Sequence, residues 1–418
     1  MRIGWVQMFS RLVFGLGLLS ATALVHPAFA TDARALQIFV SKSKQSLAVY
    51  DGTDVIATSK ISSGKSGHTT PSGIFSVIEK QTYHESNIYS GAPMPFMQRL
   101  TWSGIALHQS NSVPRYPASH GCVRMPDAFA KQLYKMTEMG VPVIITDAQL
   151  APEPVDHPML FSPHAPPPAP LLSDVELRPA IGALPVQVAM NEVAMPRLQV
   201  QPIVAPVNDQ PVKILITRRA QRETIIDLQT YLAELGFEVG NADGYLGPAT
   251  VQAIGEFKKQ HPLNPDAAKS LISDDLLRAV YSAAGKGEPP NGVIMVRQGF
   301  RSVFEAPVTI SEPELALGTH FFSAHQVNFD DGTTEWLGVT LPNTLTSQTM
   351  KRLGISTMES SIISGTPILS ALGRITIPDD TRQRIDSMLT PGSTLTISDT
   401  GVGPETGQGT DFITLTRG

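Results

Sequence analysis

The chain has 418 residues, of which 42% are hydrophobic, and a formal net charge of −5. This length is sufficient for two or three domains, and the acidic balance gives no support to nucleic-acid binding. A single cysteine excludes an internal disulfide and therefore a disulfide-stabilised scaffold. The chain also lacks His-x-x-x-His and Cys-x-x-Cys pairs, so we expect no metal site, no metallopeptidase and no cofactor.

The first 30 residues have the pattern of a secretory signal peptide. Arg2 and Arg11 flank a short N-terminal region, Leu12–Val25 is mostly apolar, and Ala28-Phe29-Ala30 fits a cleavage site before Thr31. A membrane anchor is the alternative, but the apolar run is short for a span. We therefore expect a periplasmic protein with no membrane span after cleavage. In such an oxidising compartment, one unpaired cysteine is typical of a thiol enzyme rather than of a structural protein.

Residues 31–147 form the first predicted domain. Alternating apolar residues predict strands at Leu36–Val40, Ser46–Tyr50, Val55–Ile61 and Val141–Thr146. A helix is predicted over Pro126–Met139, because its apolar residues share one face and Gly140 suits the C-terminal cap.

The cysteine lies in the string Ser119-His120-Gly121-Cys122, with Arg124 two residues later and His108 fourteen residues earlier. Taken alone, a cysteine is more often a small buried apolar residue than a nucleophile. Here it stands just before the predicted helix, where the helix dipole favours a thiolate. Gly121 allows the backbone to approach a substrate closely. The spacing therefore predicts a thiol nucleophile with a histidine partner.

These residues, together with Pro71-Ser72-Gly73-Ile74-Phe75, resemble the signature of the L,D-transpeptidase (YkuD-like) catalytic domain family. The resemblance covers residues 35–147. It implies a mostly β fold with one active-site helix.

The resemblance also implies roles for individual residues. Cys122 would be the nucleophile and His108 the base, with a backbone carbonyl near Gln109 orienting the imidazole. The N–H of Cys122, together with Gly121, would stabilise the oxyanion. His120 and Ser119 would fix the loop by hydrogen bonds. Arg124 would either bind a substrate carboxylate or anchor the loop through a salt bridge.

The substrate class of that family is the peptidoglycan stem peptide. A cysteine thioester would form with release of D-alanine, and an amine would then take the acyl group. The acceptor stays open: a second stem peptide in a 3→3 cross-link, a lysine of an envelope protein, or a free D-amino acid. With water as acceptor, the protein would be a hydrolase. A non-catalytic wall-binding scaffold is the alternative from another class, and the intact pair of His108 and Cys122 argues against it.

Residues 148–215 are rich in proline and include Pro166-Pro167-Pro168-Ala169-Pro170. Such a segment cannot donate enough backbone hydrogen bonds for a sheet, so we expect an extended linker.

Residues 222–282 are predicted to form a small three-helix module. Thr224–Leu235 has one apolar face, a second helix begins at Pro248, and Ser273 caps a third. The residues that this segment shares with the peptidoglycan-binding domain family are Leu228-Gln229, Leu232, Leu235-Gly236, Asp243-Gly244, Gly247-Pro248, Thr250, Ala253 and Phe257. The resemblance implies peptidoglycan as the partner.

Residues 291–418 align with the first domain. Gly373-Arg374-Ile375-Thr376-Ile377-Pro378-Asp379 matches Gly121–Asp127, and Trp336–Pro342 matches Trp102–His108. In this alignment Arg374 stands where Cys122 does, and Pro342 where His108 does. We therefore expect a degenerate, catalytically inactive repeat of the catalytic domain.

Overall fold

The computed structural model describes residues 35–86, 91–163, 210–264, 270–358 and 366–417. The predicted signal peptide and the centre of the predicted linker lie outside these residues. Within the described residues, no helix is long and apolar enough to cross a membrane.

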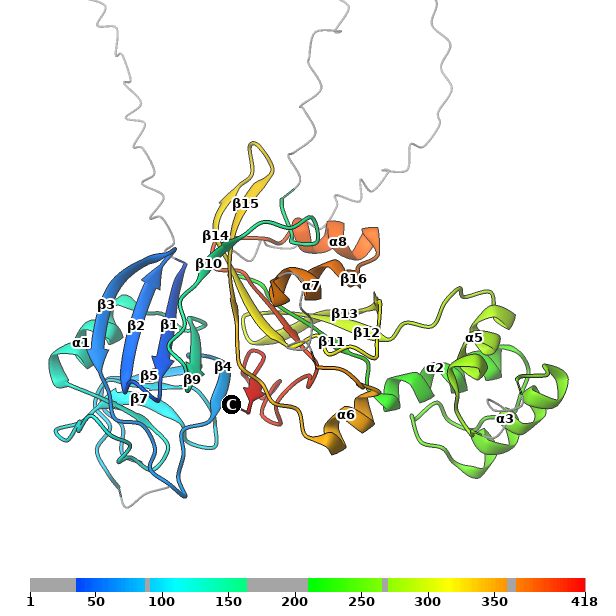
Figure 1. The fold of residues 1–418 in the computed structure, drawn as a ribbon, viewed down its shortest axis with the longest axis horizontal. Coiled ribbons are helices and arrows are strands. Elements are labelled where there is room, and N and C mark those ends of the chain that lie inside the picture. Colours follow the sequence, from blue (N-terminus) through cyan, green and yellow to red (C-terminus); the bar gives the residue numbers. More distant parts are fainter. Residues whose placement is uncertain (1–34, 87–90, 164–209, 265–269, 359–365, 418) are drawn as a thin grey trace, which may run out of the picture. The chain divides into compact units, whose positions relative to one another are not determined.

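The first domain is built on a six-stranded sheet with the order β18-β4-β9-β1-β2-β3 (Figure 1). Five of its strands come from the first domain itself: β1 (Leu36–Ser41), β2 (Ser46–Asp51), β3 (Asp54–Lys60), β4 (Ser72–Ser76) and β9 (Pro142–Thr146). The predicted strands are found within one residue or so of their expected ends. Ile38, Val49 and Phe75 of this sheet are fully buried in one core, whereas Val55 and Ile56 of β3 are exposed.

A second, four-stranded sheet with the order β5-β6-β7-β8 carries the catalytic candidates. Its strands are β5 (Glu79–Gln81), β6 (Met97–Arg99), β7 (Ala106–Gln109) and β8 (Val123–Met125), and helix α1 (Asp127–Met136) follows β8. The helix is shorter than predicted, because Thr137 adopts an extended backbone. The Thr137 hydroxyl is buried and donates to the carbonyl of Leu133 and to Gln98.

The third sheet has eight strands in the order β10-β15-β14-β17-β11-β12-β13-β16. They are β10 (Glu153–Val155), β11 (Lys213–Arg218), β12 (Gly292–Gln298), β13 (Arg301–Ile310), β14 (Thr319–Asn328), β15 (Thr333–Thr340), β16 (Ile375–Thr376) and β17 (Thr394–Ser398). Three helices also belong to this region: α6 (Ser347–Leu353), α7 (Pro367–Gly373) and α8 (Asp379–Asp386).

Both ends of the predicted linker belong to this third sheet, which corrects the boundaries 148–215 and 291–418. Strand β10 pairs with β15, and Met159–Phe161 are buried in the core of the third sheet. Strand β11 lies between β17 and β12 at the centre of the sheet. The physical reason is that Ile214, Leu215 and Ile216 are apolar and completely or almost completely buried. The helical module is therefore inserted between β11 and β12.

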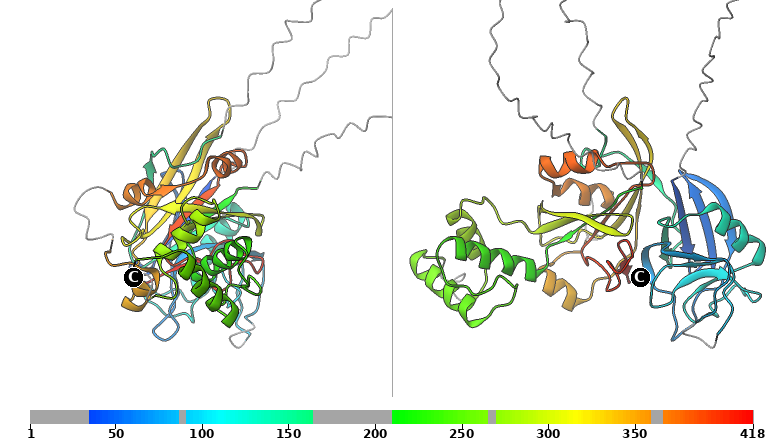
Figure 2. Two further views of the ribbon diagram at one scale, coloured as in Figure 1. Left: turned by 90° about the vertical axis from the view of Figure 1, so that its right-hand side faces the viewer. Right: turned by 180° about the vertical axis from the view of Figure 1, so that it is seen from behind.

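The helical module consists of α2 (Gln221–Glu234), α3 (Pro248–Gln260) and α5 (Asp274–Ala283) among the described residues (Figure 2). Its core includes Leu228, Leu232, Phe257 and Leu276, all fully buried. The cap expected at Ser273 is present, since its hydroxyl accepts from the N–H of Leu276 at 3.2 Å.

The last strand, β18 (Thr414–Thr416), completes the sheet of the first domain. It runs antiparallel to β4, with Leu415 opposite Gly73. Gly73 has φ +153°, and a Cβ there would lie 2.2 Å from the carbonyl oxygen of Thr414. Glycine at position 73 of the Pro-x-Gly segment thus allows the C-terminal strand to lie close to the six-stranded sheet of the first domain.

Candidate active site

Strands β7 and β8 bring His108 and Cys122 into one site. The strands run parallel, with Leu107 opposite Val123 and His108 opposite Arg124. Cys122 directly precedes β8, so the pairing places the histidine beside the segment that leaves the cysteine. The pairing of β7 with β8 thus brings together His108 and Cys122, which are fourteen residues apart in the sequence.

The environment of Cys122 differs from the expectation. The residues after it form β8, and α1 begins only at Asp127, so the cysteine is not at a helix N-terminus. Burial raises the pKa of the thiol, while the backbone N–H of Ala106 and the charges of Arg124 and Arg99 lower it. The sulfur donates to the carbonyl oxygen of Gly104 at 3.2 Å. The resting group is therefore a neutral thiol, and the expectation of a dipole-stabilised thiolate was wrong.

His108 is set up as a neutral base. Its side chain is buried, and the Nδ1–H donates to the carbonyl of Gln109 at 2.7 Å, which is the bond expected from the sequence. Because a carbonyl only accepts, Nδ1 carries the proton and the lone pair is on Nε2. Burial lowers the pKa of His108 to about 4; the Gln109 bond opposes this shift and the charge of Arg124 adds to it. The imidazole is therefore unprotonated at neutral pH.

Hydrogen bonds fix the loop before the cysteine. The Ser119 hydroxyl is buried, donates to the carbonyl of Cys122 and accepts from the N–H of Gly121 at 3.2 Å. Thr70 donates to the carbonyl of Gly121 at 2.6 Å. Gly121 has φ +118°, and a Cβ there would lie 2.9 Å from Ile105. This position therefore requires glycine for its backbone conformation.

His120 lies against a second histidine that the sequence analysis did not select. The rings of His120 and His68 meet edge to face, with centroids 4.8 Å apart. Desolvation lowers the pKa of His120, and the charges of Lys65, His68 and Arg124 lower it further. Lys65 and His68 belong to the segment that leads into Thr70-Pro71. Their position next to that motif is the sequence feature that could have identified them as residues near the site.

Arg124 is anchored through its backbone. Its N–H and carbonyl pair with the carbonyl and N–H of Ser62, both at 3.0 Å. Among the described residues, no ion pair of its guanidinium is recorded. Of the two roles expected for Arg124, the loop-anchoring salt bridge is therefore not found in this part of the chain.

Comparisons with known proteins find matches to two families. Residues 36–145 match the family model of the L,D-transpeptidase catalytic domain, and residues 221–267 match that of a peptidoglycan binding domain. No curated protein matches the chain.

Similar solved structures include L,D-transpeptidases from three organisms. The one from Mycobacterium smegmatis is 20% identical over 27% of this chain and 59% of its own, with a TM-score of 0.26. The one from Xylanimonas cellulosilytica is 29% identical over 26% of this chain and 59% of its own, with a TM-score of 0.25. The one from Enterococcus faecium is 28% identical over 26% and 48%, with a TM-score of 0.24. The matches thus span between about half and three fifths of these structures.

Proposed function

We propose that this protein is a periplasmic L,D-transpeptidase that acts on peptidoglycan through a thioester on Cys122. The observation that carries the proposal is the parallel pairing of β7 and β8, which puts a neutral His108 beside the segment of the only cysteine. The matches of residues 36–145 and 221–267 to catalytic and peptidoglycan-binding families support it.

The first half of the reaction follows from the protonation states. A neutral thiol needs a base at the moment of attack, and Nε2 of His108 has the lone pair for it. The sulfur forms a bond to the carbonyl carbon of the stem peptide before D-alanine. The bond from that carbon to the nitrogen of D-alanine then breaks, and His108 gives the thiol proton to the leaving amine. The products are a Cys122 thioester and free D-alanine.

The backbone of Cys122 is the candidate oxyanion donor. The N–H of Gly121 already donates to Ser119, whereas no acceptor for the N–H of Cys122 is recorded among the described residues. An unengaged amide at the nucleophile is free to bind the developing negative oxygen. Of the two expected oxyanion donors, the N–H groups of Cys122 and Gly121, we therefore retain only that of Cys122.

The second half of the reaction transfers the acyl group to an amine. His108 takes a proton from the acceptor amine, the new carbon–nitrogen bond forms, and the carbon–sulfur bond breaks. The proton then returns to the sulfur. A second stem peptide would give a 3→3 cross-link, and a lysine of an envelope protein would give an attached protein.

Arg124 is proposed to bind a carboxylate of the stem peptide. Its charge acts on His108, His120 and Cys122 alike, so the guanidinium lies near all three. With no ion pair recorded for it in the described part of the chain, it is available to an anionic ligand.

The third sheet is proposed to be an inactive copy of the catalytic domain. In the first sheet the parallel pair β1 and β9 is flanked by antiparallel β2 and β3 on the side of β1, and by antiparallel β4 on the side of β9. In the third sheet the parallel pair β11 and β17 is flanked in the same way by β12 and β13 on the side of β11, and by β14 on the side of β17. Arg124 of β8 pairs with Ser62, which follows the outer strand β3, and β16 pairs with the outer strand β13. The two segments therefore occupy corresponding places. In this copy the helical module is an insertion after the first strand.

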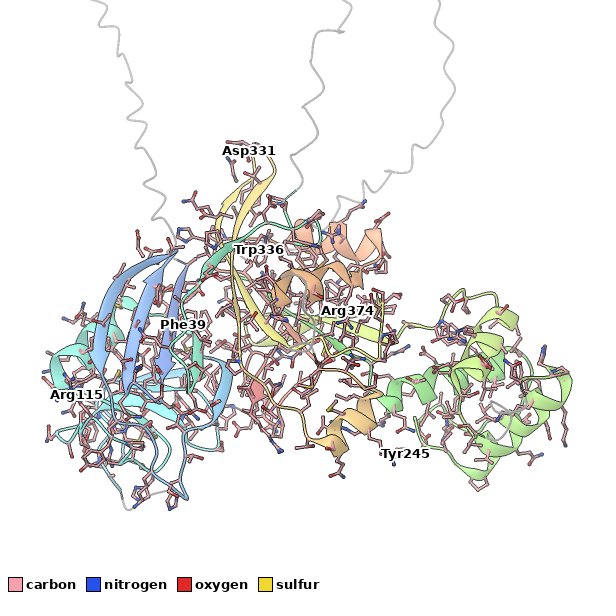
Figure 3. All side chains as sticks on the ribbon, in the orientation of Figure 1. Phe39, Arg115, Tyr245, Asp331, Trp336 and Arg374 are labelled. Carbon is pink, nitrogen blue, oxygen red and sulfur yellow. The ribbon has the colours of Figure 1, made fainter. Side chains whose placement is uncertain are left out.

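Arg374, the counterpart of Cys122, is a structural residue. Its guanidinium donates to the carbonyls of Ser311, Glu312, Leu315 and Ala316, at 2.6 to 3.1 Å. Figure 3 labels Arg374 among the side chains of this region. Strand β15 pairs with β14 and β10 rather than with β16, so the copy lacks the pairing that places His108. Within the described residues of the copy, Arg374 stands at the place of the nucleophile, and no strand pairing brings a base beside it as β7 does for Cys122. The alignment of Trp336–Pro342 with Trp102–His108 is accordingly not supported by strand pairing.

The proposal is tested with purified disaccharide-tetrapeptide. Release of D-alanine and formation of dimers are followed together by mass spectrometry, for the wild type and for Cys122→Ala. We expect both products from the wild type and neither from the variant. Release of D-alanine without dimers, in the absence of any other amine, would assign a hydrolase. Release at the wild-type rate by Cys122→Ala would refute the proposed nucleophile.

A further inference from the structure

The turn between β6 and β7, residues 100–105, forms one wall of the Cys122 site. The carbonyl of Gly104 accepts the hydrogen bond of the thiol at 3.2 Å, and Ile105 packs against Gly121. The next residue, Ala106, directs its N–H at the sulfur. Any shift of this turn therefore moves the groups that hold the thiol.

The other side of the same turn is bound by the C-terminal segment, 300 residues away. The Glu405 carboxylate accepts hydrogen bonds from the backbone N–H groups of Trp102 and Ser103, the latter at 3.0 Å. The indole N–H of Trp102 donates to the carbonyl of Gln408 at 2.7 Å. Three donors of the turn are thus satisfied by one short stretch of the C-terminal segment.

That stretch is itself firmly held on the first domain. Ile413 is 3% exposed and belongs to the core of the catalytic domain, and β18 follows it on the edge of the catalytic sheet. Within the segment, Thr410 donates to the carbonyl of Glu405 at 2.8 Å, and Thr406 accepts from the N–H of Ile413 at 3.1 Å. The segment that carries the Glu405 carboxylate is therefore held on the six-stranded sheet of the first domain.

We propose that Glu405 is a positioning residue of the active site, which acts by holding the turn that carries the acceptor of the Cys122 thiol. The C-terminal segment is on this view an integral part of the catalytic site. Hydrogen bonds to an ionised acceptor are stronger than neutral ones, which suits a carboxylate to this task. The inference deepens the proposed function and rests on it for its turnover arm.

The first test measures the thiol without a substrate. Cys122 is the only cysteine, so alkylation by iodoacetamide reports on it alone. In Glu405→Ala the Gly104 carbonyl loses its fixed place and the sulfur becomes less buried. Both changes stop favouring the neutral thiol, whereas a displaced Ala106 N–H would stop favouring the thiolate. Burial has the largest effect on this pKa, so we expect faster alkylation with a midpoint at lower pH. The charges of Arg124 and Arg99 also lower the pKa of the thiol, and both side chains remain in the variant.

The second test measures turnover of soluble disaccharide-tetrapeptide. We expect Glu405→Ala to lower kcat by roughly 10–100-fold, because a misplacement of about 1 Å can reduce the rate by about 10²-fold. KM should change little, since Glu405 is not proposed to contact the substrate. Glu405→Gln, which keeps one acceptor oxygen, should fall between. Glu335→Ala, at an exposed glutamate of β15, is the matched control and should behave as wild type.

Glu405→Ala with the alkylation profile and kcat of the wild type would overturn the inference. A variant that only melts at a lower temperature, with both readouts unchanged, would overturn it too. If Glu405→Ala does not fold by circular dichroism, Glu405→Gln decides, and an unchanged profile counts against the proposal. A wild type that releases no D-alanine would refute the proposed function instead, while the alkylation arm still tests Glu405.

Discussion

Replacing Arg374 with methionine tests whether this residue is a structural substitute for a catalytic cysteine. Arg374 is buried, and its guanidinium binds four backbone carbonyls of residues 311–316. Hydrogen bonds to a charged group each contribute about 1.5–3 kcal/mol. Removing the buried charge also relieves its desolvation cost, and we assume that this gain cancels the loss of two of the four hydrogen bonds. The net loss of stability is then that of the other two hydrogen bonds, at the lower end of the range. Arg374→Met should therefore lower the free energy of unfolding by about 3 kcal/mol.

The assay is urea unfolding followed by tryptophan fluorescence. Trp336 is 3% exposed in the core of the third sheet, and its indole donates to the carbonyl of Phe161 at 2.8 Å, so its emission reports on that core. Arg301→Met, at an exposed arginine that begins β13, controls for the loss of one positive charge. A loss below about 1 kcal/mol, within the range of ordinary substitutions, would refute the structural role.

Three further predictions concern the catalytic site and the helical module. Gly121→Ala should strongly lower D-alanine release while the protein stays folded, because φ +118° is a conformation that alanine rarely adopts, so the loop before Cys122 has to shift; wild-type turnover would contradict the geometry of the loop. The acid limb of kcat/KM should lie near pH 4, because His108 is an active base only when neutral and becomes protonated as the pH falls through about 4. An acid limb that His120→Asn abolishes and His108→Asn leaves in place would instead assign the base to His120. Deleting residues 221–283 and joining the flanking strands with a short loop should weaken pelleting with cell-wall sacculi but preserve turnover of soluble muropeptide; unchanged pelleting would give the module another partner.

The sequence predicts the elements whose information is local. Strands β1, β2, β3 and β9 follow from short apolar alternation, and the Ser273 cap from its place before a helix. The bond between His108 and the carbonyl of Gln109 was expected only from the resemblance to the catalytic family.

The failures have equally physical causes. Strand β11 was not predicted because the inserted module separates it in sequence from its sheet partner β12. The thiolate expectation failed because Val123–Met125 form a strand between Cys122 and the helix, and because burial outweighs the favourable charges on the thiol. Neither the pairing of β18 with β4 nor the contact of Glu405 with Trp102 could be read from a local pattern. The first joins residues 342 apart (Leu415 and Gly73) and the second residues 303 apart, and only the folded chain brings them together.

The central claim is that Cys122 forms a covalent acyl intermediate with the stem peptide. Brief incubation with disaccharide-tetrapeptide, acid quenching and intact-mass measurement test it directly. The account predicts an adduct with the mass of the substrate less D-alanine, located on the peptide that contains Cys122 and absent from Cys122→Ala. D-alanine release without any such adduct, or an adduct that persists in Cys122→Ala, would contradict it.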